Sequence, residues 1–367
     1  MDWDTIVIGT GGAGSAALDH LARRGARVLG IEQHTPGHDR GSSHGGTRAI
    51  RLAYFEHPAY VPLLRRAYTL WAELEAATGQ HLYTPAGVLQ IGAPGGEVVS
   101  GVLRSARTHG LDVSVLSPEA LAERFSGFRV PVGMVALFEA QAGYLCVEDA
   151  VRAHAARAVA SGAVLWEDTR AAWRAIDGGV AVQTHRGETT ARHLVLTTGA
   201  WSGLPGLSVV RKTLHWLDPR TPDAYLDGPV YLYELPTGIF YGFPQRGGHI
   251  KIAEHTGGDT VSGPASLDRR ATAQDRAPVQ QFARQWMPGV EASACVQDAV
   301  CMYTVSPDGH FVIGSHPLHP QVSVVAGLSG HGFKFAPVLG EILADLAERG
   351  ETAHPIAPFS PGRLPRP

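Results

Sequence analysis

Apolar residues near the amino end of the chain occur in short runs separated by glycine. Residues 5–8 form a run rich in β-branched side chains, which is typical of a buried parallel strand. Residues 15–24 have the apolar spacing of a helix that Gly25 ends, and residues 27–31 form a second apolar run. The pattern therefore predicts a strand, a helix and a second strand in succession.

Farther along, the pattern predicts more helices and then a different kind of sheet. Helical spacing covers residues 60–78, 118–124 and 149–161. Residues 193–201 contain another buried strand, which closes on a turn of small residues. Short alternating strands follow, separated by proline and glycine, at 211–216, 230–234, 238–243 and 249–252. These last strands predict an antiparallel sheet.

A glycine-rich turn joins the first predicted strand to the first predicted helix. The turn is Gly9-Thr-Gly11-Gly-Ala-Gly14, and the second strand ends at Glu32. Glycines let the backbone approach a pyrophosphate, the helix N-terminus adds partial positive charge, and the acid accepts hydrogen bonds from ribose hydroxyls. We therefore expect a dinucleotide site at Gly9, Gly11, Gly14 and Glu32. The motif does not separate FAD from NAD, but an acid at position 32 disfavours NADP.

The composition narrows the class of protein. The 367 residues suggest two domains, and they are 44% hydrophobic and 18% charged, with a net charge of −3. This balance disfavours nucleic-acid or membrane-surface binding, and no apolar run of about 18 residues predicts a membrane span. Cys146, Cys295 and Cys301 form neither a disulfide framework nor a CxxC motif, so we expect a cytoplasmic protein.

Lysine is rare, since only Lys212, Lys251 and Lys334 are found among the 31 basic residues. Arginine can supply charge anywhere, but only lysine supplies a compact charge whose pKa shifts readily. Lys251 and Lys334 both lie beside glycine-rich segments that contain histidine, so both are candidates for chemistry.

Several segments carry a resemblance to a known family. They include Gly41-Ser-Ser-His-Gly-Gly-Thr-Arg-Ala-Ile-Arg51, Lys251-Ile-Ala-Glu-His255, Cys301-Met-Tyr-Thr and Gly327-Leu-Ser-Gly-His-Gly-Phe-Lys-Phe335. Together they resemble the monomeric sarcosine oxidase and N-methyltryptophan oxidase family, FAD-dependent amine oxidases of the D-amino-acid-oxidase-like superfamily. Their order and spacing hold over essentially the whole chain.

The resemblance implies an α/β fold, α+β overall. A discontinuous FAD-binding domain, similar to that of glutathione reductase, would comprise residues 1–80, 145–204 and 300–367. A substrate domain with a mostly antiparallel sheet would comprise residues 81–144 and 205–299.

The resemblance also implies how FAD is held. Cys301 would carry it through a covalent 8α-thioether, although an intracellular cysteine taken alone is often a small buried hydrophobe. Cys146 and Cys295 match no family position and are interpreted as core residues. Other residues expected near the cofactor are His44, Thr47, Arg48, Gly327, Gly330, Gly332 and Lys334. The glycine turn would deliver a helix over 333–346, whose N-terminus would face the flavin.

The same resemblance implies the substrate and oxygen sites. Arg51 and Lys334 would clamp a substrate carboxylate, and His255 and Tyr241 would line the substrate face. A cation is unfavourable at a helix N-terminus, so the predicted place of Lys334 itself indicates function. Lys251 would lie at the oxygen site, where a cation about 4 Å from superoxide is worth roughly 4 kcal/mol at a dielectric near 20.

This chain departs from the family pattern at two positions. Ser43 stands where a second histidine usually precedes His44, and Gly46 stands where an aspartate is usual. Both lie near Arg51 in the sequence, so we expect the hydrogen bonds at the flavin edge to differ. No histidine pairs with a carboxylate or cysteine at metal-ligand spacing, so no metal is expected.

We therefore expect a monomeric oxidase that takes a hydride from a secondary (N-methyl) amino acid. The products would be an imine, hydrolysed to aldehyde and amine, and hydrogen peroxide from O2. Sarcosine, N-methyltryptophan, pipecolate and proline all stay open as substrates. One alternative is a flavin dehydrogenase with another electron acceptor, against which Lys251 argues. The other is a non-catalytic dinucleotide-binding protein.

Overall fold

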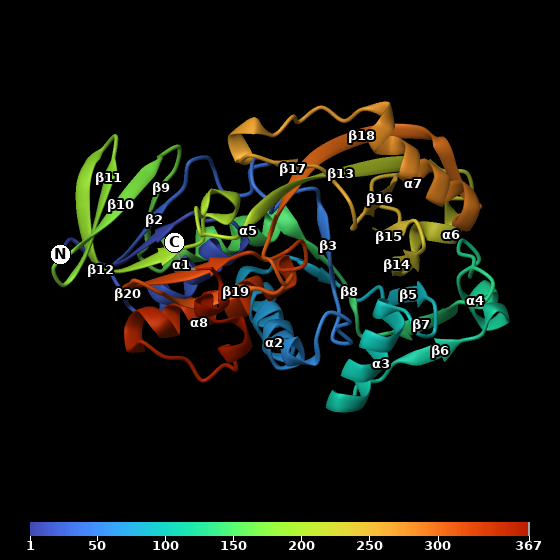
Figure 1. Cartoon of the computed structure of the whole chain (residues 1–367), viewed down its shortest axis with the longest axis horizontal. Helices are drawn as coiled ribbons and strands as arrows, with labels where there is room; N and C mark the ends of the chain where they lie inside the picture. Colours follow the sequence, from blue (N-terminus) through green and yellow to red (C-terminus); the bar gives the residue numbers. More distant parts are fainter. Residues whose placement is uncertain (366–367) are drawn as a thin grey trace.

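The computed structural model of the protein describes residues 1–365 and contains a mainly parallel sheet at one end (Figure 1). Its parallel strands are, in spatial order, β20 (His319–Ala326), β12 (Gly187–Leu196), β1 (Trp3–Ile8), β2 (Val28–Ile31) and β9 (Val164–Trp166). The antiparallel strands β10 (Ala171–Ile176), β11 (Gly179–Thr184) and β19 (Val312–His316) extend it. The strand predicted within 193–201 is β12, which pairs in parallel with β1.

Four helices pack around this sheet. They are α1 (Gly12–Arg23), α2 (Val61–Thr78), α5 (Val147–Ala160) and α8 (Ala336–Arg349). Leu21, Leu64, Ala150 and Leu339, one from each helix, belong to a single buried apolar cluster. None of the helices in the described part of the chain is both long and apolar enough to span a bilayer.

A mostly antiparallel sheet forms the other end of the molecule (Figure 1). Its order is β17 (Thr260–Val261), β13 (Ser208–Pro219), β16 (Ile250–Glu254), β15 (Gly238–Gly242), β14 (Val230–Leu235), β5 (Val88–Gly92), β7 (Val135–Glu139) and β6 (Ser114–Leu116), with β18 (Val290–Val305) beside β13. Only β14 and β5 run parallel to each other. The α/β class and the predicted antiparallel sheet are confirmed.

The two faces of this second sheet differ. Helix α7 (Ala273–Trp286) covers one face, where Phe282 packs in a cluster with Leu89, Tyr233 and Phe240. Because side chains alternate along a strand, the residues between these point to the opposite face. The remaining helices are α3 (Glu97–His109), α4 (Pro118–Arg124) and α6 (Asp223–Leu226).

A third, smaller sheet is built from strands that lie, along the chain, between strands of the two large sheets. It consists of β3 (Thr47–Ile50), β8 (Gly143–Cys146) and β4 (Tyr83–Thr84). Strand β18 runs from residue 290 to 305 without interruption, across residue 300, where the sequence analysis places a domain limit. The proposed domain limits stay a prediction.

The helix predicted over 333–346 begins later than expected. Residues Phe333–Phe335 form a 3-10 turn, and α8 starts at Ala336. Pro337 occupies an early position of α8, where its missing N–H needs no partner, and this favours a start at that point. Lys334 therefore lies in the turn before the helix and not in the helix's first turn.

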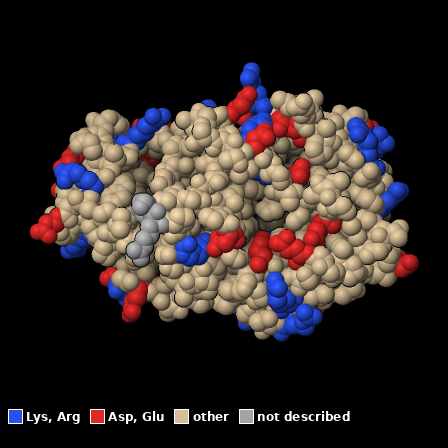
Figure 2. All heavy atoms as spheres, viewed as in Figure 1, with Lys and Arg blue, Asp and Glu red and all other residues tan. Residues whose placement is uncertain are grey.

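Charged side chains are dispersed over the surface. On the face shown in Figure 2, basic and acidic residues are interspersed, and most of the surface carries neither. This face shows no one-sided basic patch of the kind that nucleic-acid binding requires.

Candidate active site

A cavity of about 650 Å³ is lined by residues from both large sheets. The parallel sheet contributes Ile8, Ile31 and Val325, and the antiparallel sheet contributes Leu232 and Tyr241. Most of the residues singled out from the sequence lie along this cavity: Gly9, Gly11, Glu32, Arg48, Arg51, Tyr241, His255, Gly327, Gly330, Gly332 and Lys334.

The glycine turn has the backbone that a dinucleotide needs. Gly9 has a φ of 86°, and a Cβ at Gly14 would lie 1.9 Å from the Gly9 carbonyl oxygen, so both positions require glycine. At Gly11, by contrast, a Cβ would meet only Ser43 Oγ, at 3.6 Å. Ser43 Oγ also accepts a hydrogen bond from the Gly12 N–H, at 3.1 Å. The turn thus leaves room for a phosphate at the start of α1.

Glu32 is held as an ionised carboxylate at the end of β2. Its two oxygens accept hydrogen bonds from the N–H groups of Thr10, at 2.8 Å, and His34, at 3.1 Å. Burial alone would raise the pKa of Glu32, but the neighbouring His38 and these backbone donors lower it below its usual value. An ionised acid at this place can accept from ribose hydroxyls.

Cys301 lies on β18 just behind the cavity wall. Its buried sulfur does not line the cavity, whereas the next residues, Met302 and Tyr303, do. Arg48 Nη2 lies 3.7 Å from the Cys301 Sγ. Burial raises the pKa of the thiol, but the neighbouring His44 and Arg48 outweigh it, so the pKa falls to about 7. A thiol with this pKa is partly ionised at neutral pH, so Cys301 is a candidate nucleophile beside the cavity.

Three other predicted cofactor residues, Gly14, His44 and Thr47, also lie outside the cavity lining. His44 is buried, and its Nε2 has no hydrogen-bond partner. The carbonyl oxygen of Thr47 accepts a hydrogen bond from Lys251, at 2.8 Å.

The glycine loop before α8 comes close to Tyr303. Gly330 has a φ of 82°, and a Cβ there would lie 2.3 Å from the Tyr303 ring, so no other residue fits. Lys334, at the end of this loop, donates to the His331 carbonyl at 2.7 Å and to Tyr54 Oη at 3.4 Å. Burial, reinforced by the charge of Arg51, lowers the pKa of Lys334 well below its usual value.

Arg51 faces an internal carboxylate. Its Nη2 lies 2.9 Å from both carboxylate oxygens of Glu56, and its Nε, also buried, has no partner. Its guanidinium stacks over the rings of Tyr54 and Phe55, with 4.7 and 4.9 Å to the ring centroids. Burial alone would raise the pKa of Glu56, but the charge of Arg51 lowers it below the usual value. Glu56 thus occupies the position where a substrate carboxylate is expected.

His255 lies between two tyrosines on the wall of the cavity. Its ring centroid is 6.4 Å from that of Tyr241 and 5.6 Å from that of Tyr303, and its Nδ1 is 3.4 Å from Tyr303 Oη. Burial lowers the pKa of His255 to about 4, so the ring is neutral at neutral pH. The three side chains offer neutral hydrogen-bonding groups to a ligand.

Lys251 does not share the cavity of Arg51 and Lys334. It lines a second cavity of about 540 Å³, and none of residues 1–365 lines both cavities. Its Nζ donates to the carbonyls of Gly45 and Thr47, both at 2.8 Å, and lies 4.1 Å from the Phe243 ring centroid. Burial, with a further contribution from Arg48, lowers the pKa of Lys251 well below its usual value.

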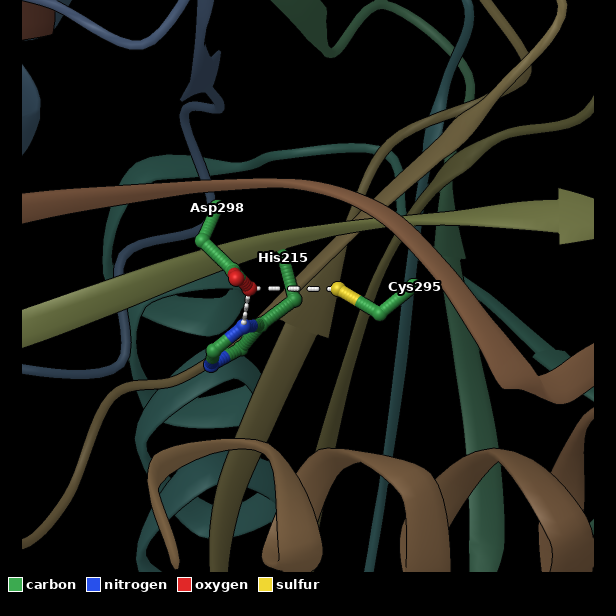
Figure 3. Close-up of side chains that lie close together, drawn as sticks. All are labelled: His215, Cys295 and Asp298. Carbon is green, nitrogen blue, oxygen red and sulfur yellow. Dashed lines mark hydrogen bonds and ion pairs between the residues drawn. The ribbon is translucent and has the colours of Figure 1, made fainter. Parts of the chain in front are cut away.

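The structure brings together a histidine, a cysteine and an aspartate that the sequence spacing did not reveal (Figure 3). Asp298 Oδ1 lies 2.6 Å from His215 Nδ1 and 3.1 Å from Cys295 Sγ. His215 and Asp298 are cross-strand partners, and the unpaired residue Val296 forms a bulge that turns Cys295 to the same face.

This cluster corrects one expectation, because Cys295 is half-buried and hydrogen-bonded and is not a core residue. Residue types that can bind a metal meet here in space, and the expectation that no metal is bound stays a prediction. Asp298 also accepts hydrogen bonds from Arg276 of α7, at 2.5 and 2.9 Å. Burial and the neighbouring Asp298 raise the pKa of the Cys295 thiol to about 11. The carboxylate therefore ties β13, β18 and α7 together, away from the large cavity. Cys146, in contrast, is buried as predicted.

The sequence pattern did not predict three residues of the cavity, Tyr303, Glu56 and Gln90. Tyr303 lies two residues after Cys301 on the same strand, and this spacing could have identified it. Glu56 follows Arg51 in a segment with no regular pattern, so only the fold reveals their pairing. Gln90 is a single amide inside the apolar run 88–91, and that interruption was the available signal.

The fold and cavity define a dinucleotide-binding protein with a second sheet over the site. A family model described as FAD dependent oxidoreductase matches residues 4–346, and the chain belongs to this family. The monomeric sarcosine oxidase of Streptomyces avermitilis is 42% identical, covering 99% of this chain and 98% of that protein. The N-methyl-L-tryptophan oxidase of Salmonella dublin is 38% identical, covering 99% and 100%. The resemblance seen in the sequence is confirmed.

Solved structures have the same fold. NikD, described as an unusual amino acid oxidase essential for nikkomycin biosynthesis, superposes with a TM-score of 0.86. It is 25% identical and covers 98% of this chain and 97% of its own. The residues of this site fit FAD, because the backbone at Gly11 is open to a phosphate and the ionised Glu32, which can accept from ribose hydroxyls, lines the same cavity.

Proposed function

We propose that the protein oxidises secondary (N-methyl) amino acids with O2, releasing hydrogen peroxide and an imine that hydrolyses to aldehyde and amine. The names of its relatives point to substrates like sarcosine or N-methyltryptophan. The observation that carries the proposal is that two buried basic side chains, Arg51 and Lys334, line the same cavity as the dinucleotide turn.

In this proposal Cys301 holds FAD covalently through a thioether, and Arg48 and His44 keep its thiol ionisable. Gly9, Gly11, Gly14 and Glu32 hold the dinucleotide part, and the 327–334 loop borders the ring. The chemistry supplied by bound FAD is acceptance of a hydride from the substrate carbon and transfer of both electrons to O2.

Arg51 and Lys334 bind the substrate carboxylate. The entering carboxylate replaces Glu56 on the fork of Arg51, whose Nε is free to donate a further hydrogen bond. Lys334 supplies a second positive charge from the opposite loop. Since both cations are buried, their attraction for an anion is little screened by water.

The same two cations favour the reactive form of the amine. A like charge nearby lowers the pKa of an ammonium group, so the bound substrate loses its proton more easily. A hydride can leave the carbon next to a neutral amine, because the nitrogen lone pair stabilises the developing cation. His255, Tyr241 and Tyr303 orient that amine with neutral groups. His255 is too weak a base to be the main proton acceptor.

Lys251 acts on oxygen from the second cavity. Its positive charge stabilises the superoxide-like anion that forms when O2 takes its first electron. This role favours an oxidase over a dehydrogenase with another acceptor. We further propose that the protein acts as a monomer in the cytoplasm, as the name of the Streptomyces relative and the three free cysteines suggest.

A peroxide-coupled screen of N-methyl and cyclic amino acids tests the function. Peroxide formation with concurrent bleaching of the yellow protein is expected for at least one of them. Bleaching under anaerobic conditions with no oxygen consumption in air would indicate the dehydrogenase. A yellow protein that no secondary amino acid bleaches would favour a non-catalytic dinucleotide-binding protein.

A further inference from the structure

Gln90 is a buried amide without a partner. Its side chain is fully buried on β5 and lines the large cavity, yet neither Oε1 nor Nε2 has a hydrogen-bond partner. Among residues 1–365 it is the only glutamine with both amide atoms in this state. Leaving a buried polar group unpaired is unfavourable, so we expect the amide to pair with a molecule that is not part of the folded chain.

The neighbours of Gln90 on the adjoining strands are apolar. Its cross-strand neighbours are Leu137 on β7 and Leu232 on β14, and Val88 precedes it on the same face. Leu137 belongs to an apolar cluster with Phe55 and Val99. A leucine at position 90 would suit this wall better than glutamine. The amide has no partner in this structure, and a molecule that enters the cavity can supply one.

The sheet register fixes how far Gln90 lies from the reacting groups. Gln90 pairs with Leu232, and Leu232 pairs with Tyr241. Neighbouring strands are about 4.8 Å apart, so the backbones of Gln90 and Tyr241 are separated by about 10 Å. A ligand with its amine at Tyr241 and His255 needs a side chain to reach Gln90. Sarcosine has no side chain on its α carbon.

We propose that Gln90 is a specificity residue that recognises a neutral hydrogen-bonding group on the substrate's side chain, such as a hydroxyl, a carboxamide or a ring N–H. The inference rests on the proposed oxidation of N-methyl amino acids and narrows its substrate class. A carboxamide supplies one acceptor oxygen and two N–H donors. Arg51 and Lys334 repel a basic side chain in the same cavity, and Glu56 repels an acidic one.

Matched substrate pairs test this. N-methyl-L-tyrosine and N-methyl-L-phenylalanine differ by one hydroxyl, and N-methyl-L-asparagine and N-methyl-L-leucine have similar shapes. For at least one pair, the kcat/KM of the wild-type protein should be about tenfold to a hundredfold higher for the polar member than for the apolar member. Both members of that pair should have a higher kcat/KM than sarcosine. Gln90→Leu should abolish that preference. The same change at the exposed helix position, Gln281→Leu, should leave the preference as in the wild type.

Thermal unfolding separates recognition from a structural role. Because Gln90 has no partner to lose, Gln90→Leu should keep or raise Tm by a few degrees. A Tm lowered by several degrees would mean that the amide is paired within the protein and would overturn the inference. So would a wild type that favours the apolar member of both pairs, or a Gln90→Leu variant that retains the polar preference.

A binding measurement keeps this inference distinct from the proposed function. If no N-methyl amino acid is oxidised, the proposed function fails, but the cavity can still be titrated. The flavin spectrum can then report the Kd values of 4-hydroxyphenylacetate and phenylacetate for the holoprotein. The wild type should bind 4-hydroxyphenylacetate more tightly than phenylacetate. If the ratio of these two Kd values were the same in wild type and Gln90→Leu, Gln90 would be rejected as a recognition residue.

Discussion

Arg51 and Glu56 form a buried ion pair in which one guanidinium nitrogen lies 2.9 Å from both oxygens of the carboxylate. Both residues line the cavity, and Lys334 and His331 lie nearby. The protein thus carries its own carboxylate at the site proposed for the substrate's carboxylate. On binding, the substrate carboxylate must therefore displace Glu56 from Arg51. The strength of the Arg51–Glu56 pair reduces the net affinity for the substrate.

Removing this internal competitor should tighten binding. Glu56→Gln leaves Arg51 without its carboxylate, so a substrate carboxylate should bind better by about 1.4 kcal/mol, a roughly tenfold lower KM. The unliganded variant should also be less stable, because Arg51 then stays buried without a counter-charge. Steady-state kinetics and thermal unfolding, each with and without a carboxylate ligand, measure both effects.

Glu123→Gln removes the same charge from an exposed position on α4 and should change neither KM nor Tm by a comparable amount. A higher KM in Glu56→Gln would mean that Glu56 helps to bind the substrate. The exchange of carboxylates on Arg51 would then be wrong.

Arg51→Ala should lose most of the recognition of the carboxylate. Without this guanidinium, Glu56 and the substrate carboxylate lose their common partner in a desolvated site. The resulting decrease in kcat/KM should correspond to about 2–5 kcal/mol of lost transition-state stabilisation. Lys334→Met should have a smaller effect of the same kind, since it removes a point charge and no bidentate contact. The check is the ratio of kcat/KM for an N-methyl amino acid and its decarboxylated amine. Equal ratios in wild type and Arg51→Ala would exclude the clamp.

The dinucleotide turn was predictable because its chemistry is local. Gly9 is fixed by its backbone conformation and Gly14 by its close approach to the Gly9 carbonyl, both within one strand and one helix. Glu32 is fixed by the end of the next strand. The start of α8 was misplaced by three residues, since periodicity continues through the 3-10 turn and only Pro337 marks the change.

Residues that meet through the tertiary fold escaped prediction for a different reason. Gln90 faces the cavity because of the alternation of β5 and its register with β14, which no single segment encodes. Cys295 turns toward His215 because one unpaired residue, Val296, shifts the alternation of β18. A one-residue bulge reverses the facing of a side chain, and the sequence carries no clear signal of where that bulge falls.

Covalent attachment should depend on the ionisation of Cys301. Acid-precipitated wild-type protein should keep the yellow colour in the pellet, and Cys301→Ala should release it. Because a thiolate is the nucleophile and the thiol has a pKa of about 7, attachment to the apoprotein should speed up as pH rises toward 7 and then level off. Cys146→Ser and Cys295→Ser are matched controls that should retain the colour. Free FAD in the supernatant of the wild type would reject the covalent link.

Lys251 should govern the reaction with oxygen and leave the reaction with the amine nearly unchanged. It lines a cavity separate from that of Arg51, and its Nζ is fixed by the carbonyls of Gly45 and Thr47. Lys251→Met keeps the apolar length of the side chain and removes the charge. Anaerobic flavin reduction should therefore change little. Reoxidation by O2 should fall by about two to three powers of ten, which corresponds to roughly 4 kcal/mol at a dielectric near 20.

The pH dependence gives a second test of the same charge. Burial lowers the pKa of Lys251, and the charged form of the side chain predominates only below that pKa. Reoxidation should therefore slow as the pH rises. The midpoint of this decline should lie below 10.5, the usual pKa of lysine. This decline should be absent from Lys251→Met, whose reoxidation is slow at every pH. Stopped-flow absorbance measures both half-reactions, with Lys212→Met as the control because Lys212 lines neither cavity. Slow reduction with normal reoxidation in Lys251→Met would place this lysine at the substrate and reverse the assignment of the two cavities.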